Sequence, residues 1–367
     1  MASNKKEPFR DQIFNNAATK WTQVGANDGD IVLSSRLRLA RNMKGMPFPF
    51  RLPAQKEKIL ADVVAGAIEQ LEKKTRHEYC FLRLAELTVL ERQQLLEKHL
   101  ISKELAASED YPAVAIRKDE AIAIMVNEED HIRIQCFLPG LQLDQVWQLA
   151  NEVDDILCGQ LNFAFDNEFG YLTACPTNVG TGMRASVMLH LPALVTIKKL
   201  DAIFATLPKL GLTVRGLYGE GTKGAGNLFQ ISNQVTLGNG ELEIIHHLQS
   251  VVSQVVEKER QARRILQKEY AITLYDKIWR ACGTLAFARS ISTDELIERL
   301  SQLRLGVDMG IIGGITGEEI NALLIATQPA FIQSRAEKEL SPSIRDWERA
   351  TLVRKVLANV MEVNAHD

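Results

Sequence analysis

Five arginines lie within or at the ends of segments that the sequence predicts as β-strands. They are Arg36, Arg38, Arg133, Arg184 and Arg215. A guanidinium group is planar and permanently charged, and its fork of N–H donors matches phosphate oxygens two at a time. Arg36 and Arg38 alternate with leucines, and taken alone they are most simply a solvated sheet face. Five such residues beside glycine-rich loops indicate instead a site that binds a nucleoside triphosphate and neutralises charge on a transferred phosphoryl group.

Two glutamates and a cysteine lie in loops that could converge on these arginines. Glu129 belongs to the acidic turn NEED, Glu220 to the loop GEGTKG, and Cys175 opens the turn-rich segment CPTNVGTG. Each alone is most simply a solvated acid or a buried structural thiol. Together they could orient a cationic acceptor. A protonated guanidinium cannot attack phosphorus, but carboxylates that hold its N–H groups can align one nitrogen and accept its proton.

Two glycine-rich stretches match dinucleotide-binding sequence patterns, but the elements predicted after them do not. Residues 219–224 read G-x-G-x-x-G and residues 180–185 read G-x-G-x-x-A. That fingerprint requires a helix directly after the loop, whereas the residues that follow here alternate like strands. The H-R-D and D-F-G motifs of protein kinases do not follow either. We interpret both stretches as loops between strands where the backbone approaches another group closely.

The elements that must position these residues follow from hydrophobic periodicity. Strands are predicted at 30–40, 113–116, 121–126, 132–136, 171–174, 185–191, 212–217 and 228–237. Helices are predicted at 55–73, 88–100, 143–161 and 193–210. The strands often follow one another without a helix between them. We therefore expect an α+β fold, with a mostly antiparallel sheet flanked by helices.

From residue 240 onward the pattern becomes helical. A long helix is predicted over 241–269, and a last helix over 343–363. Two more helices start at the capping boxes Ser292/Glu295 and Thr316/Glu319. We therefore predict an α+β domain over residues 1–255 and a smaller all-helical domain over residues 256–367.

Composition bounds the class of protein. The 367 residues carry a net charge of -3, from 43 basic and 46 acidic residues, so no global basic excess points to nucleic acid. No apolar run approaches the ~18 residues that span a bilayer. Five widely spaced cysteines do not form a disulfide framework, and we expect a cytoplasmic protein. The seven histidines show no metal-binding spacing, so magnesium would arrive with a nucleotide and be held mainly by its phosphates.

Four blocks resemble the signature segments of the phosphagen kinase family, in the family's order. They span residues 33–45, 126–134, 175–192 and 215–234. The resemblance implies a phosphagen-kinase-like catalytic domain, Mg-ATP as donor and a guanidino group as acceptor. By position it makes the five arginines the nucleotide-phosphate ligands. It also makes Glu129 and Glu220 the carboxylates that hold the guanidinium, Cys175 the thiol beside it, and Glu128 a support for magnesium through water.

This sequence differs from the phosphagen kinases that act on small guanidino compounds, and the differences indicate one branch of the family. Only about thirty residues precede the SSR motif, where those kinases carry a helical domain. Met188, Tyr218 and Gln234 stand where the family has histidine, arginine and lysine. Together with the extra helical region, this pattern resembles the bacterial protein arginine kinases. It implies ATP-dependent phosphorylation of arginine side chains in proteins, as a mark in stress response and quality control.

The last helical segment contains a further candidate site. Arg345 and Arg349 lie one turn apart in RDWERA, with Asp346 beside them. By the residues alone this is most simply a solvated charged face. In the protein arginine kinases an R-D-x-x-R-A segment binds phosphoarginine as an allosteric signal, and the resemblance implies the same role here.

The resemblance also implies partners. They are a transcriptional repressor as a protein substrate with exposed arginine, a zinc-binding activator protein and a Clp-type protease. We expect neither direct nucleic-acid nor membrane binding, and we expect a homo-oligomer, with a dimer as the favoured state. Two alternatives stay open. One is a kinase for free arginine or another small guanidino compound, and the other is a non-catalytic phosphate- or nucleic-acid-binding protein. Which glutamate accepts the proton also stays open.

Overall fold

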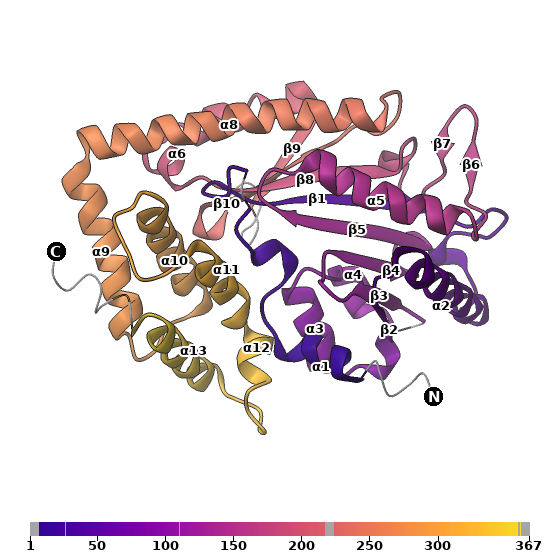
Figure 1. The fold of residues 1–367 in the computed structure, drawn as a ribbon, viewed down its shortest axis with the longest axis horizontal. Helices are drawn as coiled ribbons and strands as arrows, with labels where there is room; N and C mark the ends of the chain where they lie inside the picture. Colours follow the sequence, from indigo (N-terminus) through magenta and orange to yellow (C-terminus); the bar gives the residue numbers. More distant parts are fainter. Residues whose placement is uncertain (1–6, 26, 110, 217–223, 359, 361–367) are drawn as a thin grey trace.

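The chain folds around one large sheet. The computed structural model describes residues 7–25, 27–109, 111–216, 224–358 and 360. Eight strands form the sheet in the order β2-β3-β4-β5-β1-β8-β10-β9, and neighbouring strands are antiparallel (Figure 1). Their bounds are β1 Val32–Arg41, β2 Tyr79–Arg83, β3 Ala113–Arg117, β4 Ile122–Val126, β5 Ile132–Pro139, β8 Met183–His190, β9 Leu212–Gly216 and β10 Leu228–Asn233. The predicted α+β class with an antiparallel sheet is confirmed.

Three long helices cover one face of this sheet. Helix α2 packs on β2 and β3, α5 on β1 and β5, and α8 on β8 and β10 (Figure 1). Their bounds are α2 Ala54–Thr75, α5 Leu143–Cys158 and α8 Glu241–Glu269. In α5 the buried residues Val146, Ala150, Val153 and Leu157 recur at helical spacing, so one stripe of the helix faces the sheet.

The opposite face is divided between a second core and a polar region. Over β2, β3 and β4 it is covered by α1 (Glu7–Asn15), α3 (Val89–Glu97) and α4 (Lys103–Ala107). These helices bury Ile13 and Leu95 against Val114 and Met125 of the strands. Over β5, β1 and β8 the same face carries arginine side chains. On this face of the sheet, a charged surface over β5, β1 and β8 therefore lies next to an apolar core over β2, β3 and β4.

The C-terminal part of the described chain is helical. It comprises α9 Ala271–Phe287, α10 Thr293–Asp308, α11 Gly317–Ala326, α12 Pro329–Gln333 and α13 Pro342–Val356. The backbone N–H groups of Glu295 and Glu319 donate to the hydroxyls of Ser292 and Thr316, so both predicted helix starts are confirmed. Helix α10 packs on the short 3-10 turn η7 (Ala225–Asn227), and α12 packs on α3 (Figure 1).

Several predicted elements differ from the observed ones. Instead of one helix over 193–210, the chain forms α6 (Pro192–Thr196), α7 (Leu200–Phe204) and the 3-10 turn η6 (Leu207–Leu210). Lys198 has a φ of 56°, a left-handed conformation that ends a right-handed helix, so the apolar periodicity misleads here. The predicted strand at 171–174 shrinks to β7 (Gly170–Tyr171), which pairs with β6 (Phe165–Asp166). Strand β2 and helices α1 and α9 are not among the predicted elements.

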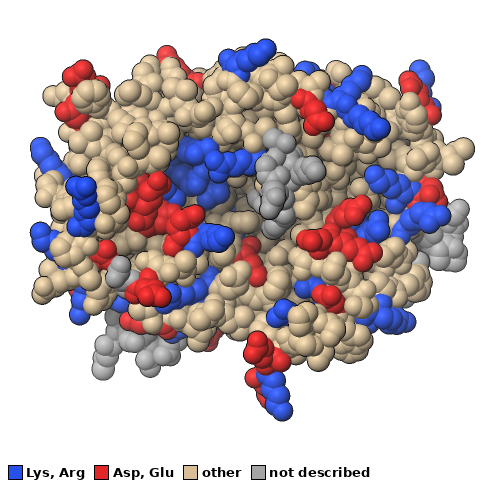
Figure 2. Space-filling model, turned by 180° about the vertical axis from the view of Figure 1, so that it is seen from behind, with Lys and Arg blue, Asp and Glu red and all other residues tan. Residues whose placement is uncertain are grey.

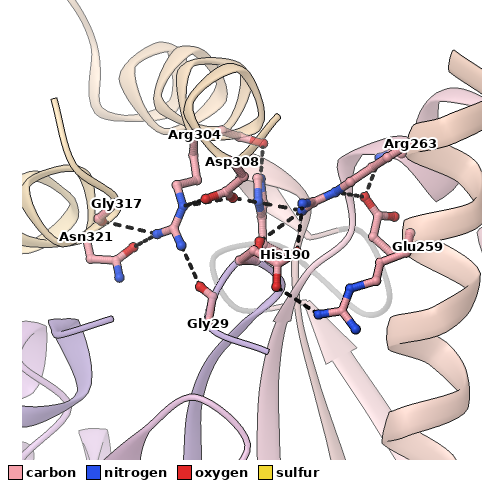
Figure 3. A network of polar contacts seen from close by, with 12 residues as sticks. Gly29, His190, Glu259, Arg263, Arg304, Asp308, Gly317 and Asn321 are labelled. Carbon is pink, nitrogen blue, oxygen red and sulfur yellow. Dashed lines mark hydrogen bonds and ion pairs between the residues drawn. The ribbon is translucent and has the colours of Figure 1, made fainter. Parts of the chain in front are cut away.

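A buried polar network joins the sheet to the C-terminal helices (Figure 3). Arg304 of α10 donates from Nε to Asp308 at 2.8 Å and from Nη1 to the Asn321 side chain at 2.8 Å. Its Nη2 donates to the backbone oxygen of Gly29, just before β1, at 2.7 Å. One guanidinium therefore ties α10 and α11 to the start of the central strand.

A second buried arginine, Arg263, extends the network to α8, and His190 joins β8 to α10 (Figure 3). Arg263 donates to the backbone oxygen of Asp30 at 2.9 Å and pairs with Glu259 at 3.3 Å. The His190 ring at the end of β8 lies 2.8 Å from the Ser301 hydroxyl of α10. The predicted domain boundary at residue 255 falls inside the continuous helix α8, and the division into two domains stays a prediction.

Candidate active site

Strand register places the predicted arginines on one face of the sheet. Arg38 of β1 is directly opposite Arg184 of β8 and opposite Gln135 of β5. Arg36 and Arg133 lie two residues from Arg38 and Gln135 on their strands. Because side chains alternate between the faces of a sheet, these four arginines project from the same face.

Arg215 joins them from the edge of the sheet. It is opposite Gln230 of β10, which is opposite Met188 of β8. Met188 lies four residues from Arg184, so Arg215 shares the face of the other arginines. Five residues from four strands are thus brought together by antiparallel pairing.

A cavity of about 660 Å³ opens over this face. Arg38, Arg133, Arg184 and Arg215 line it, together with Glu128, Glu129 and Cys175. A hollow with basic side chains gathered over it and acidic ones beside them is visible near the middle of the face in Figure 2. Most of the predicted site residues therefore meet in one space.

Arg36 is the predicted arginine that does not line the cavity. Its guanidinium donates to the Gln135 side chain and lies over the Phe137 ring, 5.2 Å from the ring centroid. Burial, together with the neighbouring Arg133 and Arg184, lowers the pKa of Arg36 to about 9. Arg36 therefore stays protonated at neutral pH and adds positive charge next to the cavity.

The cluster holds positive charge that the protein itself does not neutralise. Burial and the surrounding arginines lower the pKa of Arg38 well below its ordinary value, and burial and Arg215 lower the pKa of Arg184. Within the described residues, the Nε–H groups of Arg36, Arg38 and Arg184 are buried without a hydrogen-bond partner. Unpaired buried donors cost free energy. A polyanion such as a nucleoside triphosphate fits this cluster, because its oxygens would satisfy donors and offset repulsion.

Hydrogen bonds of the Asn127 side chain fix the turn that carries Glu129. Asn127 takes a left-handed conformation with a φ of 59°, and its side chain donates to the backbone oxygens of Glu57 and Tyr111, both at 3.0 Å. Arg133 donates to Glu128 and to Glu129, each at 2.7 Å. The Glu129 carboxylate is therefore in a position to bind a guanidinium group.

A buried aspartate connects this turn to the segment that carries Cys175. One oxygen of Asp130 accepts from the Asn42 side chain at 2.6 Å and from the Ala174 backbone N–H at 2.7 Å. The Cys175 sulfur lies 3.0 Å from the Thr177 hydroxyl. The sequence placed Asn127 and Asp130 in the turn NEED before the strand of Arg133, but it indicated no contact of Asn42, Asn127 or Asp130 with the site. Their signal was polar residues at strand ends beside candidate site residues.

Two glycines of the segment before Arg184 are required by close packing. Gly180 and Gly182 have φ values of 111° and 62°. A Cβ at Gly180 would lie 2.3 Å from the Thr236 backbone oxygen, and one at Gly182 would lie 2.7 Å from that of Ala40. The prediction of close backbone approach is confirmed for this loop. The atoms that a Cβ would meet at these two glycines belong to this chain itself.

Glu220 and Tyr218 lie outside the described residues. The flanking elements β9 and η7 are described, and Arg215 near the end of β9 lines the cavity. Gln234 lines a smaller hollow of about 190 Å³ with Arg184 and Arg215.

The predicted phosphoarginine-binding residues lie on α13 and not in the arginine cavity. Arg349 is buried, and it donates to the backbone oxygens of Thr327 and Ile291, both at 2.9 Å, and to Asp346. Arg345 is half-buried. Through its hydrogen bond to Ile291, Arg349 therefore fixes α13 against the segment before α10.

The described residues contain no group of three or more histidine, cysteine, aspartate or glutamate side chains arranged to hold a metal ion. A magnesium ion that arrives with a nucleotide would be held mainly by its phosphates, and Glu128 is among the carboxylates on the cavity wall. None of the helices in the described ranges is long and apolar enough to cross a membrane.

Comparison with solved structures identifies the fold. The duplicated taurocyamine kinase from Schistosoma mansoni matches with a TM-score of 0.59 and 23% identity, over 75% of this chain and 41% of that chain. Lombricine kinase matches with a TM-score of 0.55 and 21% identity, over 70% of this chain and 79% of that chain. These likenesses show a phosphagen-kinase-like fold.

Family models agree with the fold and the site. The model described as ATP:guanido phosphotransferase, C-terminal catalytic domain, matches residues 60–262. The chain is thus an enzyme of the ATP:guanido phosphotransferase class. The model described as Protein-arginine kinase McsB C-terminal domain matches residues 271–367.

Curated relatives narrow the class further. The protein-arginine kinase of Desulforamulus reducens is 50% identical over 94% of this chain and 97% of its own length. That of Moorella thermoacetica is 48% identical over 93% of this chain and 97% of its own length. The chain belongs to the protein-arginine kinase family.

Proposed function

We propose that this enzyme transfers the γ-phosphoryl group of ATP to the guanidino group of arginine side chains in proteins. The observation that supports this most directly is the cavity where four arginines of one sheet face meet Glu129 and Cys175. The arginines suit the phosphates of the donor, and the carboxylate suits the guanidinium of the acceptor. Relatives about half identical over nearly the whole chain are protein-arginine kinases.

The reaction is an in-line displacement at phosphorus. A guanidino nitrogen attacks the γ-phosphorus, a P–N bond forms, the bond to the bridging oxygen of ADP breaks, and one proton leaves the nitrogen for a carboxylate. Glu129 and Glu220 orient the guanidinium, and one of them accepts this proton. Cys175 lies beside the same guanidinium. Magnesium, when bound with the nucleotide, neutralises phosphate charge, and Glu128 would hold it through water.

Arg133 links the two halves of this site. It pairs with Glu128 and Glu129 at 2.7 Å, so a guanidinium already occupies the position proposed for the acceptor. When phosphates enter, Arg133 turns to them, and the substrate guanidinium takes its place at Glu129. Charge pairing is conserved in this exchange, because Glu129 keeps a guanidinium partner throughout.

The proposal extends to regulation and partners on the strength of the family resemblance. Arg345, Asp346 and Arg349 of α13 would bind phosphoarginine as an allosteric signal. The partners would be a transcriptional repressor as substrate, a zinc-binding activator and a Clp-type protease. The enzyme would act in the cytoplasm as a homodimer.

Label transfer from γ-labelled ATP tests the activity. Free arginine and an arginine-rich protein are offered side by side with Mg²⁺, and the product is treated with acid, which cleaves a P–N bond but spares a serine ester. We expect acid-labile label on the protein. Label on free arginine alone would contradict protein substrates, and no label on either would favour a phosphate-binding protein without catalysis.

A further inference from the structure

A second cavity lies directly beside the arginine cavity. It has a volume of about 330 Å³ and shares four lining residues with the first, namely Ser108, Asn127, Glu128 and Glu129. The turn that carries Glu129 is therefore the wall between the two spaces. We call the second space the flanking cavity. Anything bound in it lies next to the proposed position of the acceptor guanidinium.

The flanking cavity has the opposite chemistry to its neighbour. Its remaining lining residues are Pro49, Phe50, Glu57 and Ala174, so no lysine or arginine is among the described residues that line it. Three of its eight lining residues are glutamates, and two of them, Glu128 and Glu129, also pair with Arg133. It therefore combines an acidic wall with an apolar edge, which suits an extended polypeptide segment with apolar or basic side chains.

Phe50 is the most exposed part of this edge. Its side chain is 71% exposed, although it is large and apolar. It stacks on Phe48 with ring centroids 6.2 Å apart and planes 22° apart, and the Arg51 guanidinium lies 5.7 Å from the Phe50 centroid. The ring therefore has Phe48 and Arg51 as neighbours, and most of its surface stays open to an apolar group of a partner. An exposed, supported aromatic ring beside a cavity is typical of a contact surface for a partner.

The floor of the flanking cavity is connected to the turn of Glu129. Asn127 donates to the backbone oxygen of Glu57, which lines this cavity, and to that of Tyr111. A segment seated against Phe50 and Glu57 therefore rests on the groups that hold the Glu129 turn in its left-handed conformation. Binding there bears directly on the orientation of the acceptor.

We propose that the flanking cavity binds the residues next to the target arginine in the substrate polypeptide. An apolar side chain of the substrate packs on Phe50 and Pro49, and the acidic wall favours basic over acidic neighbours of the target. The occupant follows from the shared wall with the arginine cavity and from charge complementarity. This inference rests on the proposed function, because the occupant is the protein substrate of that reaction.

Short peptides with one central arginine test the inference. Three peptides differ only in the residues beside the arginine, which are alanine, leucine or glutamate, and acid-labile label from γ-labelled ATP is measured. We expect kcat/KM to rank leucine above alanine above glutamate, with about tenfold between the extremes. A fourth peptide with lysine neighbours should exceed the glutamate peptide by a similar factor, and its advantage should shrink at high salt.

The Phe50→Ala variant tests whether Phe50 causes the preference for leucine beside the target arginine. The variant should raise KM for the leucine peptide several-fold, leave kcat little changed and abolish the difference between leucine and alanine. Phe287→Ala is the matched control, because Phe287 is 64% exposed on α9 and does not line either cavity. A Phe50→Ala enzyme that keeps the wild-type ranking would overturn the inference. Failure of the wild-type enzyme to label any arginine peptide would instead overturn the proposed function.

Discussion

Arg38 faces Arg184 across two neighbouring strands, and both have a buried Nε–H without a partner among the described residues. Like charges this close repel each other, and their burial adds a desolvation cost. The cluster therefore lowers the stability of the fold while it creates affinity for an anion. Such a conflict between stability and local charge is expected where a site is built for function.

This conflict predicts opposite effects of one substitution. Arg38→Met should raise the free energy of unfolding by about 1 kcal/mol, because an apolar side chain of similar length removes the buried charge. It should lower kcat for label transfer by at least about a hundredfold, since one positive group is lost from the proposed phosphate site. Thermal unfolding measures the change in stability, and label transfer measures kcat. Added ATP should stabilise the wild-type protein far more than the variant. A less stable variant with unchanged ATP stabilisation would contradict this account.

At the scale of elements, a single glutamate joins α3 to α12. Glu97, at the last position of α3, accepts hydrogen bonds from the backbone N–H groups of Ala330 at 2.9 Å and of Phe331 at 3.3 Å. These are among the first N–H groups of α12, which have no partner within their own helix. Burial raises the pKa of Glu97 to about 7, although those hydrogen bonds and Arg349 oppose the rise.

The raised pKa predicts a pH dependence of this junction. A carboxyl whose pKa is higher in the folded chain binds its proton more tightly when folded, so its stabilising contribution is present at low pH and is lost as the pH rises through the folded value. For Glu97 the loss falls between its ordinary value of 4.5 and about 7. Glu97→Gln should therefore remove part of the fall in unfolding free energy over this range.

Urea unfolding at pH 5 and pH 8 measures this contribution. Glu86→Gln, which changes an exposed glutamate before α3, is the control and should keep the wild-type pH dependence. If Glu97→Gln and the wild-type protein lose the same free energy between pH 5 and pH 8, Glu97 is not the group that titrates.

At the scale of the whole molecule, buried arginines join the sheet to the C-terminal helices. Arg304 binds Asp308, Asn321 and Gly29 from three of its nitrogens, and Arg263 binds Asp30 from the neighbouring helix α8 (Figure 3). Burial raises the pKa of Asp308 to about 6, with Arg304 and Arg263 opposing the rise. Because α8 also passes through the predicted domain boundary, we expect the chain to unfold as one cooperative unit.

Removal of Arg304 tests that cooperativity. Arg304→Ala leaves the Asp308 carboxylate and the Asn321 side chain with fewer buried partners, and should destabilise the protein by about 3–5 kcal/mol. Because the lost contacts lie between the sheet and the helices, unfolding should also separate into two transitions in calorimetry. Arg280→Ala, which removes an exposed arginine of α9, should keep one transition. A single, merely weakened transition in Arg304→Ala would show that other contacts carry the coupling.

Local patterns predicted many of the elements. The predicted bounds of α8 are those observed, and the capping residues Thr88, Ser292 and Thr316 mark observed helix starts. Helix periodicity, capping and strand alternation depend on residues a few positions apart, so the chain itself carries this information. Lys198 is an exception, because apolar periodicity does not encode its left-handed backbone conformation.

The alternation of arginines and leucines in 33–39 also determined that Arg36 and Arg38 share one face of their strand, whatever the fold. Only the tertiary structure decided that Arg184 lies opposite Arg38, that Asp130 ties Asn42 to the segment of Cys175, and that a flanking cavity forms beside Glu129. These contacts join residues 44 to 146 positions apart in the chain. Their geometry depends on strand register and on the packing of distant segments, which no local pattern specifies.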